Sequence, residues 1–342
     1  MEKINGKTTL FFKNKPSIIG TSTIVGPKEG EGNLAKYFDK IIDDDKFGEK
    51  TFEKAECKML TYAIEHSIKN AGLKLDDIDA ILSGDLLNQI ISSSFSAREF
   101  NIPYLGVYNA CSTMTEALLL SAALIDGGYM ENTVAATGSH FSTAERQYRY
   151  PLELGCVRPP QSQWTVTGAG SAVISARQGD FPKITCATIG KVTDFGVTDA
   201  NNMGAAMAPA AMTTLLTHFK NTKLAPDYYD LIITGDLGAL GSRLLKDIMK
   251  ERGVNIDLKH VDCGELIFNI DEKEYQGGSG AGCSATVFNS YIYDKLKRKK
   301  LNKVLFVATG ALLSTVSTQQ GETIPAIAHA VSIDNDKGVN ND

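Results

Sequence analysis

Cys111 is the residue of this 342-residue chain whose surroundings offer the most chemistry. It belongs to the segment NACS (109–112), directly before the run TMTEALLLSAALI (113–125). That run is apolar on nearly every face of a helix and carries one charge, so a helix buried inside the molecule is predicted. Ser112 and Thr113 are good residues for the start of a helix. Cys111 is therefore expected at the N-terminus of a central helix, at the mouth of a pocket.

Three roles for the Cys111 thiol are open. Free N–H groups and the positive end of the helix dipole favour a thiolate, so Cys111 could be a covalent nucleophile. The same geometry binds a carboxylate or phosphate, in which case Cys111, Ser112 and Thr113 line an anion pocket. A purely structural role is the third possibility, because free cysteine is among the most buried residue types.

Further polar residues follow the next predicted strand. Ser139 and His140 come after the strand beside the buried helix, and ligands bind at the carboxyl ends of strands in such sheets. Arg146 and Arg149 belong to the aromatic segment RQYRY and could clamp a carboxylate with paired hydrogen bonds. The alternatives are a hydrogen-bonded loop histidine for His140, and a surface loop or dimer contact for the two arginines.

The elements that position these residues are predicted from an internal repeat. Three pairs of segments match in the same order: 77–86 with 228–237, 111–112 with 283–284, and 134–138 with 306–310. The last two pairs share one offset, which is hard to obtain by chance. Each half is predicted to run strand, Gly-Asp turn, helix, strand, small-residue turn, buried helix, strand and Thr-Gly turn. Such alternation implies parallel pairing, with an N-terminal half at 1–178 and a C-terminal half at 179–342.

Composition narrows the classes of function. The chain has 35 basic and 40 acidic residues and a net charge of -5, so nucleic acid is not an expected partner. The six cysteines form no CxxC or Cys/His pattern, so no metal or cofactor is predicted. Neither a signal peptide nor a 20-residue apolar run is visible, and dispersed cysteines then indicate a reducing interior. The basic run 295–300 is predicted to be a solvated helix end, with contact to anionic lipid as the alternative.

A family resemblance joins these features. The NACS turn with its buried helix resembles the nucleophile turn of the thiolase superfamily, which includes ketoacyl synthases. The segment VTGAGSAV (166–173) resembles the strand that closes the first half of those enzymes. The resemblance implies an α/β thiolase-like fold, with two similar βαβαβ-type halves in a five-layer α-β-α-β-α arrangement. It also implies a homodimer.

The second half departs from the pattern of the enzymes. They use a His after the strand that here reads LIITGD (231–236), and an Asn in the segment that here reads GGSGAGC (277–283). Neither residue type is present there, so an enzyme of the usual mechanism is not expected. The second-half ligand-binding residues are predicted in and after these segments: Asp236, Gly278, Ser279, Cys283 and His329. For Cys283 and His329 a structural role in the core is the alternative.

A narrower resemblance is to the stage V sporulation protein AD family of spore-forming Firmicutes. The segments that carry it are 80–89, 144–151, 203–211, 277–280, 307–314, 322–325 and 327–329. It implies a non-catalytic protein that binds dipicolinic acid, free or as its calcium chelate. It further implies a role in uptake of that ligand into the developing spore, with membrane proteins of the stage V sporulation A operon at the inner spore membrane. The alternatives are an acyl-CoA-dependent enzyme with Cys111 as nucleophile, and an assembly protein with a vestigial pocket.

Overall fold

The computed structural model describes residues 4–5, 8–148, 157–269 and 275–335. Most strands form one mixed sheet in the order β12-β11-β14-β15-β10-β3-β9-β7-β5-β6, and β8 and β13 pair separately. The strands are β1 (Ile4–Asn5), β2 (Thr9–Phe11), β3 (Ser17–Val25), β4 (Lys40–Ile41), β5 (Ala80–Gly84), β6 (Tyr104–Gly106), β7 (Asn132–Ser139), β8 (Trp164–Thr165), β9 (Gly168–Ser175), β10 (Lys183–Thr188), β11 (Leu231–Thr234), β12 (His260–Asp262), β13 (Gly278–Ser279), β14 (Lys303–Ala311) and β15 (Ala326–Asp334).

The helices alternate with these strands along the chain. They are α1 (Pro27–Gly30), α2 (Phe52–Asn70), α3 (Ile91–Arg98), α4 (Thr113–Asp126), α5 (Phe141–Tyr148), α6 (Met203–Thr222), α7 (Gly238–Glu251), α8 (Cys263–Ile267), α9 (Ala281–Val287), α10 (Tyr293–Lys297) and α11 (Thr315–Gln319). The predicted alternation of strands and helices is therefore present in both parts of the sequence.

The sheet has the same strand order on both sides of its middle. From the centre outward it runs β3, β9, β7, β5, β6 in one direction and β10, β15, β14, β11, β12 in the other. β5 pairs parallel with β6 and β7, and β11 pairs parallel with β12 and β14, as the repeat predicts. The two sets meet where Ser17 of β3 pairs with Lys183 of β10. The boundary between residues 178 and 179 stays a prediction.

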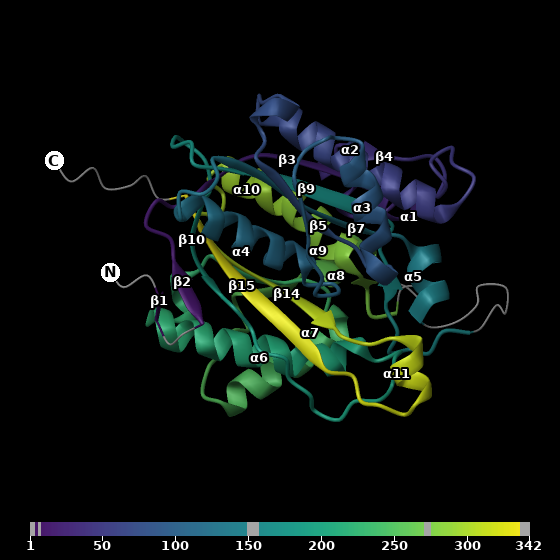
Figure 1. The fold of residues 1–342 in the computed structure, drawn as a ribbon. Coiled ribbons are helices and arrows are strands. Elements are labelled where there is room, and N and C mark those ends of the chain that lie inside the picture. Colours follow the sequence, from purple (N-terminus) through teal and green to yellow (C-terminus); the bar gives the residue numbers. More distant parts are fainter. Residues whose placement is uncertain (1–3, 6–7, 149–156, 270–274, 336–342) are drawn as a thin grey trace.

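Five layers are visible in Figure 1, as predicted. α2 and α3 cover the first-half strands, α4 and α9 lie between the two sets of strands, and α6 and α7 cover the second-half strands on the outside. Apolar side chains make each contact. α2 packs on β5, β7 and β9, whereas α6 packs on β14 and β15. The core around α4 and α9 is closed off from solvent on both sides.

The central helix α4 confirms the prediction of a buried helix. Its apolar residues are buried around most of its circumference, because strands of both halves pack against it. The helix ends at Gly127, and the next residue, Gly128, has φ +76°, a left-handed conformation that glycine adopts without steric cost. This stop directs the chain into β7.

The second central helix, α9, approaches the sheet so closely that only small residues fit. A Cβ on Gly170 of β9 would lie 2.3 Å from the carbonyl oxygen of Ala285, which explains the glycines of the segment 166–173. Gly280, which precedes α9, has φ +96°. The glycine-rich segment thus serves a turn and close helix packing.

One detail of the predicted order is wrong. The Thr137-Gly138 and Thr309-Gly310 pairs were expected in turns, but they lie inside β7 and β14. Both strands run further than their apolar residues indicate because each is paired along its length, β7 with β9 and β14 with β15. The threonine side chains are consequently buried within the sheet.

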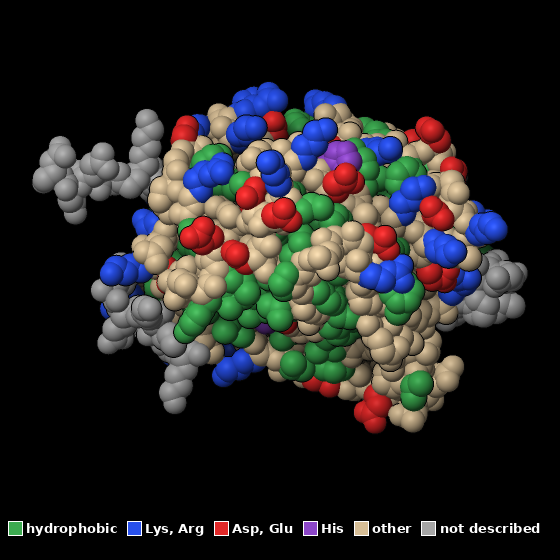
Figure 2. All heavy atoms as spheres, turned by 45° about the horizontal axis from the view of Figure 1, so that its top comes forward, with side chains coloured by type: hydrophobic (Ala, Val, Ile, Leu, Met, Phe, Trp, Pro, Cys, Tyr) green, Lys and Arg blue, Asp and Glu red, His purple; other side chains and the backbone are tan. Residues whose placement is uncertain are grey.

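Charged side chains of both signs are interspersed over the face shown in Figure 2. The basic run 295–300 occupies the end of α10 and the turn after it. Arg298 pairs with Asp294 at 2.7 Å, and Lys299 pairs with Asp180. These ion pairs agree with a solvated helix end. Among the described helices, none combines the length and apolar character needed to span a membrane.

Candidate functional site

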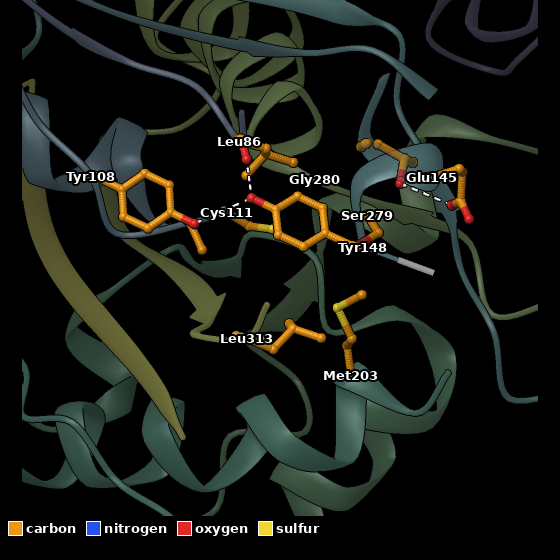
Figure 3. Close-up of a pocket in the computed structure, with 13 residues that line it drawn as sticks. Leu86, Tyr108, Cys111, Glu145, Tyr148, Met203, Ser279, Gly280 and Leu313 are labelled. Carbon is orange, nitrogen blue, oxygen red and sulfur yellow. Dashed lines mark hydrogen bonds between the residues drawn. The ribbon is translucent and has the colours of Figure 1, made fainter. Parts of the chain in front are cut away.

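A pocket lies beside the start of α4 and encloses about 400 Å³, counted up to its open mouth (Figure 3). Its walls come from both halves of the chain and are mostly apolar. The lining residues are Leu86, Tyr108, Ala110, Cys111, Ala144, Glu145, Tyr148, Thr165, Met203, Ser279, Gly280, Ala311 and Leu313.

Cys111 reaches this pocket because the chain turns sharply in front of α4. Ala110 has φ +49°, a left-handed conformation that is uncommon outside glycine and that clusters at functional sites. The N–H groups of Ser112 and Thr113 donate to the carbonyl oxygens of Asn109 and Ala110, at 3.0 and 3.3 Å. The Cys111 side chain, 6% exposed, faces the pocket.

The helix start does not present Ser112 and Thr113 to a ligand as expected. Their N–H groups are used within the turn, and their hydroxyls donate back to Asn109 and Ala110, each at 2.7 Å. Ser112 is the residue before the helix, but its side chain makes no capping hydrogen bond. Both residues therefore shape the turn that carries Cys111.

Asp236 is the second-half residue that meets Cys111. The Cys111 thiol donates to its carboxylate, which also accepts hydrogen bonds from the Gly280 N–H and the Thr309 hydroxyl, each at 3.0 Å. Ser279 lies 3.4 Å from the same carboxylate. Burial raises the pKa of Asp236 to about 7, against the lowering effect of these hydrogen bonds. The thiol thus faces an acid.

His329 and Asn109 support the turn from behind. His329 lies in β15, is buried, and accepts a hydrogen bond from the Gly190 N–H at 3.1 Å. Its Nε2 lies 3.1 Å from the side-chain amide of Asn109. Burial lowers the pKa of His329 to about 4, so the imidazole is neutral at pH 7. His329 is close to the site but does not line the pocket.

Ser139 and His140 are both away from the pocket walls. The Ser139 hydroxyl donates to the Val166 carbonyl at 2.7 Å and accepts from the Gly282 N–H at 3.0 Å. The His140 Nε2 lies 2.7 Å from the carbonyl oxygen of Asp45. Burial lowers the pKa of His140, which agrees with the hydrogen-bonded histidine left open by the sequence. Ser139 joins the two halves, whereas His140 holds a surface loop.

The structure does not bring Arg146 to the pocket. Arg146 forms an ion pair with Glu53, and both side chains are more than a third exposed. This is the surface arrangement that the sequence left open. Arg149 lies outside the described residues.

Of the remaining second-half residues, Ser279 alone lines the pocket. Gly278 pairs with Trp164 in the short β13–β8 sheet, which forms one wall. Cys283 is fully buried, and its thiol lies 3.3 Å from the Gly235 carbonyl oxygen. Burial raises the pKa of the Cys283 thiol well above its usual value, so it stays protonated. The structural alternative for Cys283 is the one that the geometry supports.

Several residues in or beside the pocket were not predicted from the sequence. Tyr108 and Tyr148 come from different elements, and their hydroxyls meet at 3.3 Å (Figure 3). Glu145 precedes the predicted arginine by one residue, and its carboxylate lies 3.2 Å from Arg158. Tyr108 directly precedes the NACS turn, which could have suggested it. Arg158 lies in irregular chain without any periodic pattern.

The fold is shared with condensing enzymes of the thiolase superfamily. 3-oxoacyl-[acyl-carrier-protein] synthase III from Aquifex aeolicus VF5 superposes with a TM-score of 0.57, covering 93% of this chain and 99% of its own at 15% identity. OleA from Xanthomonas campestris with bound cerulenin superposes with a TM-score of 0.60. The match covers 95% of this chain and 97% of the OleA chain at 13% identity. Identity at this level defines the fold alone, and the fold predicted from the sequence is confirmed.

Sequence comparison then defines the family. Residues 6–334 match the family model for Stage V sporulation protein AD (SpoVAD). The Stage V sporulation protein AD of Bacillus subtilis (strain 168) is 47% identical over 329 residues, which span 96% of this chain and 97% of the relative. The chain belongs to the stage V sporulation protein AD family and is a sporulation protein with a thiolase-like fold.

Proposed function

We propose that this protein binds dipicolinic acid (pyridine-2,6-dicarboxylic acid) in the Cys111 pocket without altering it chemically. The observation that carries the proposal is the contact between Cys111 and Asp236. A carboxylate beside the thiol disfavours a thiolate, because two negative charges would then share one desolvated site. Among the described residues that line the pocket there is no histidine to act as a base.

The shape of the pocket suits a small flat ring. Tyr108 and Tyr148 stand on one side with Leu86 near them, and Leu313 lies beside Met203 on the other side (Figure 3). Aromatic and apolar walls with a few placed polar groups are typical of sites for small organic ligands.

The biological setting of the proposal comes from the family. In it, the bound ligand, free or as its calcium chelate, is handed to membrane proteins of the same sporulation operon and taken up into the developing spore. The protein is then peripheral to the inner spore membrane, and it works as a homodimer.

Calorimetric titration with dipicolinate tests the proposal. We expect a saturable heat with one site per chain, and a much smaller one with pyridine-2,6-dicarboxamide, which has the same shape without charge. Circular dichroism before and after the titration verifies the fold. Folded protein that gives no saturable heat with dipicolinate, with or without calcium, would overturn the proposal.

A second candidate is an acyl-CoA-dependent condensing enzyme, favoured by the retained Cys111 at the pocket wall. Incubation with acyl-CoA followed by intact-mass measurement decides it. An added acyl group on wild-type protein that is missing from the Cys111→Ala variant supports this candidate. An unmodified mass with short and long acyl chains rejects it. A third candidate, an assembly protein, predicts that Cys111→Ala spores still take up dipicolinate.

A further inference from the structure

We propose that Arg158 is the cation that binds a ligand carboxylate at the Cys111 pocket, and that Glu145 occupies Arg158 until the ligand displaces it. The inference rests on the proposed function for the identity of the ligand. The inference supplies a positive charge for the pocket. Neither Lys nor Arg is among the described residues that line it. A dianion entering a desolvated site needs such a partner.

Arg158 is held in place but is not fully paired. Its Nη1 lies 3.2 Å from Glu145 Oε1, and its Nη2 donates to the carbonyl oxygen of Gln163. Its Nε is buried and has no hydrogen-bond partner among the residues that the structure describes. A guanidinium group carries five N–H donors, and a buried donor left unpaired costs free energy. The open Nε position is therefore available to an acceptor outside the described part of the chain, and a ligand carboxylate is such an acceptor.

Two aromatic rings lie beside this guanidinium group. Its central carbon lies 5.3 Å from the ring centroid of Trp164 and 5.6 Å from that of Phe141. The two rings stack on each other at 3.9 Å and 9°. Cation–π contacts and stacking reduce the freedom of the arginine, so less conformational entropy is lost when it binds a carboxylate.

Glu145 connects this arginine to the pocket. Its side chain is 4% exposed and lines the pocket, at the end opposite Tyr108 in Figure 3. Its Oε1 also accepts a hydrogen bond from the Thr165 hydroxyl at 3.3 Å. Thr165 follows Trp164 in β8, so the pocket wall and the arginine support are neighbouring residues of one strand. A ligand carboxylate at this end of the pocket would compete with Glu145 for Arg158.

The proposed exchange is non-covalent and makes a directional prediction. The Glu145→Gln substitution keeps the shape of the side chain and removes its charge, which leaves Arg158 available. We expect this variant to bind dipicolinate several-fold more tightly than the wild type. Removing Arg158 from the same background should weaken binding by at least about tenfold, the scale of one charge-assisted hydrogen bond.

The chain contains a reporter for this experiment. Trp164 is its single tryptophan and lies against Arg158, so intrinsic fluorescence follows events at this group directly. Titrations with dipicolinate compare the wild type, E145Q and the double variant E145Q/R158Q. The double variant leaves no buried charge unpaired, which protects folding. R158K provides a second test that retains the charge but loses the Nε donor and the planar fork.

Two controls separate charge from other effects. Pyridine-2,6-dicarboxamide should bind all variants with equal affinity, because it offers no carboxylate. R146Q removes an exposed arginine that pairs with Glu53 away from the pocket, and should match the wild type. Melting curves for each variant verify the folded state.

The outcomes distinguish this inference from the proposed function. If the wild type binds dipicolinate and loss of Arg158 changes nothing, the inference is wrong and the proposed function stands. If only E145Q binds, and does so only with Arg158 present, the ligand does not displace Glu145 in the natural protein, and both the inference and the proposed function are overturned. If no variant binds dipicolinate, both are overturned.

Discussion

The Gly-Asp-Leu turn occurs once in each half of the molecule, and its aspartate has a different task in each. In the first half, Asp85 accepts hydrogen bonds from the Leu87 N–H at 2.8 Å and from the Ser93 N–H at 2.7 Å. Ser93 lies in the first turn of α3, so Asp85 satisfies N–H groups at the start of a helix. In the second half, Asp236 turns toward Cys111 instead.

A single difference between the edge strands explains this change. Ser83 of β5 pairs with Gly106 in β6, whereas the corresponding Thr234 of β11 pairs with Asp262 in β12. Asp262 accepts hydrogen bonds from Leu237 N and Gly238 N, at 2.9 Å each. It thereby satisfies the N–H groups at the start of α7, and Asp236 contacts Cys111 and Gly280 instead. The aspartate of a repeated turn thus takes a different partner when a neighbouring strand supplies the helix-start acceptor.

The largest expected effect on stability comes from replacing Asp262. Asp262→Ala leaves buried N–H groups of Leu237, Gly238 and Gly264 and the Thr234 hydroxyl without their acceptor. We expect a loss of roughly 4 kcal/mol in the free energy of unfolding, because each unsatisfied buried donor costs about 1–3 kcal/mol. Urea denaturation measures it.

The matched control is Asp257→Ala, an aspartate of the same part of the chain that pairs with Lys250 at the surface. Asp257→Ala should lower the free energy of unfolding by less than about 1 kcal/mol. Equal losses from the two substitutions would contradict the role assigned to Asp262.

A smaller effect is expected from the titration of Asp236. Burial raises its folded-state pKa to about 7, while the unfolded value is near 3.8. Between these values the unfolded chain is ionised and the folded protein holds its proton, so stability falls as pH rises from about 4 to 7. Relative to Asp236→Asn, the wild type should lose on the order of 3 kcal/mol in the free energy of unfolding across this pH window. Above about pH 7 the difference should stay constant.

Chemical denaturation at pH 5, 6, 7 and 8 measures this difference. Asp85→Asn, prepared in parallel, removes the aspartate of the other turn and should not flatten the same curve to the same extent. If the Asp236→Asn and wild-type curves stay parallel over the whole range, the shifted pKa of Asp236 is refuted.

Much of the architecture could be predicted because it depends on local pattern. The run 113–125 is apolar on nearly every face and predicts a central helix, and the repeated segments mark equivalent strands. Cys111 could be placed at the pocket because its turn directly precedes that helix. These features require no knowledge of which distant residues are neighbours.

The polar partners could not be predicted, because each depends on a residue far away in the sequence. His140 is occupied by the carbonyl of Asp45, and the orientation of Asp236 depends on Asp262. Arg158 follows a segment outside the described residues and owes its position to Trp164. Such pairings are set by tertiary packing, which hydrophobic periodicity does not encode.

A still smaller effect is expected at the first-half turn. Asp85→Ala removes acceptors from Leu87 and Ser93, and we expect a loss of about 1–2 kcal/mol, the usual range for a lost helix cap. Dipicolinate affinity should change less than it does in Asp236→Asn. A larger affinity loss for Asp85→Ala than for Asp236→Asn would show that the two turns do not divide their tasks as described.

The smallest effect concerns the two equivalent cysteines. Cys111 is 6% exposed and faces the pocket, whereas Cys283 is fully buried with a raised pKa. Iodoacetamide at pH 8, followed by peptide mass mapping, should modify Cys111 slowly and leave Cys283 intact in the folded protein. Asp236→Asn should raise the rate at Cys111 a few-fold, because the thiolate no longer meets a carboxylate. An unchanged rate would show that Asp236 does not restrain the thiol, and the case against a nucleophilic Cys111 would then lose its physical basis.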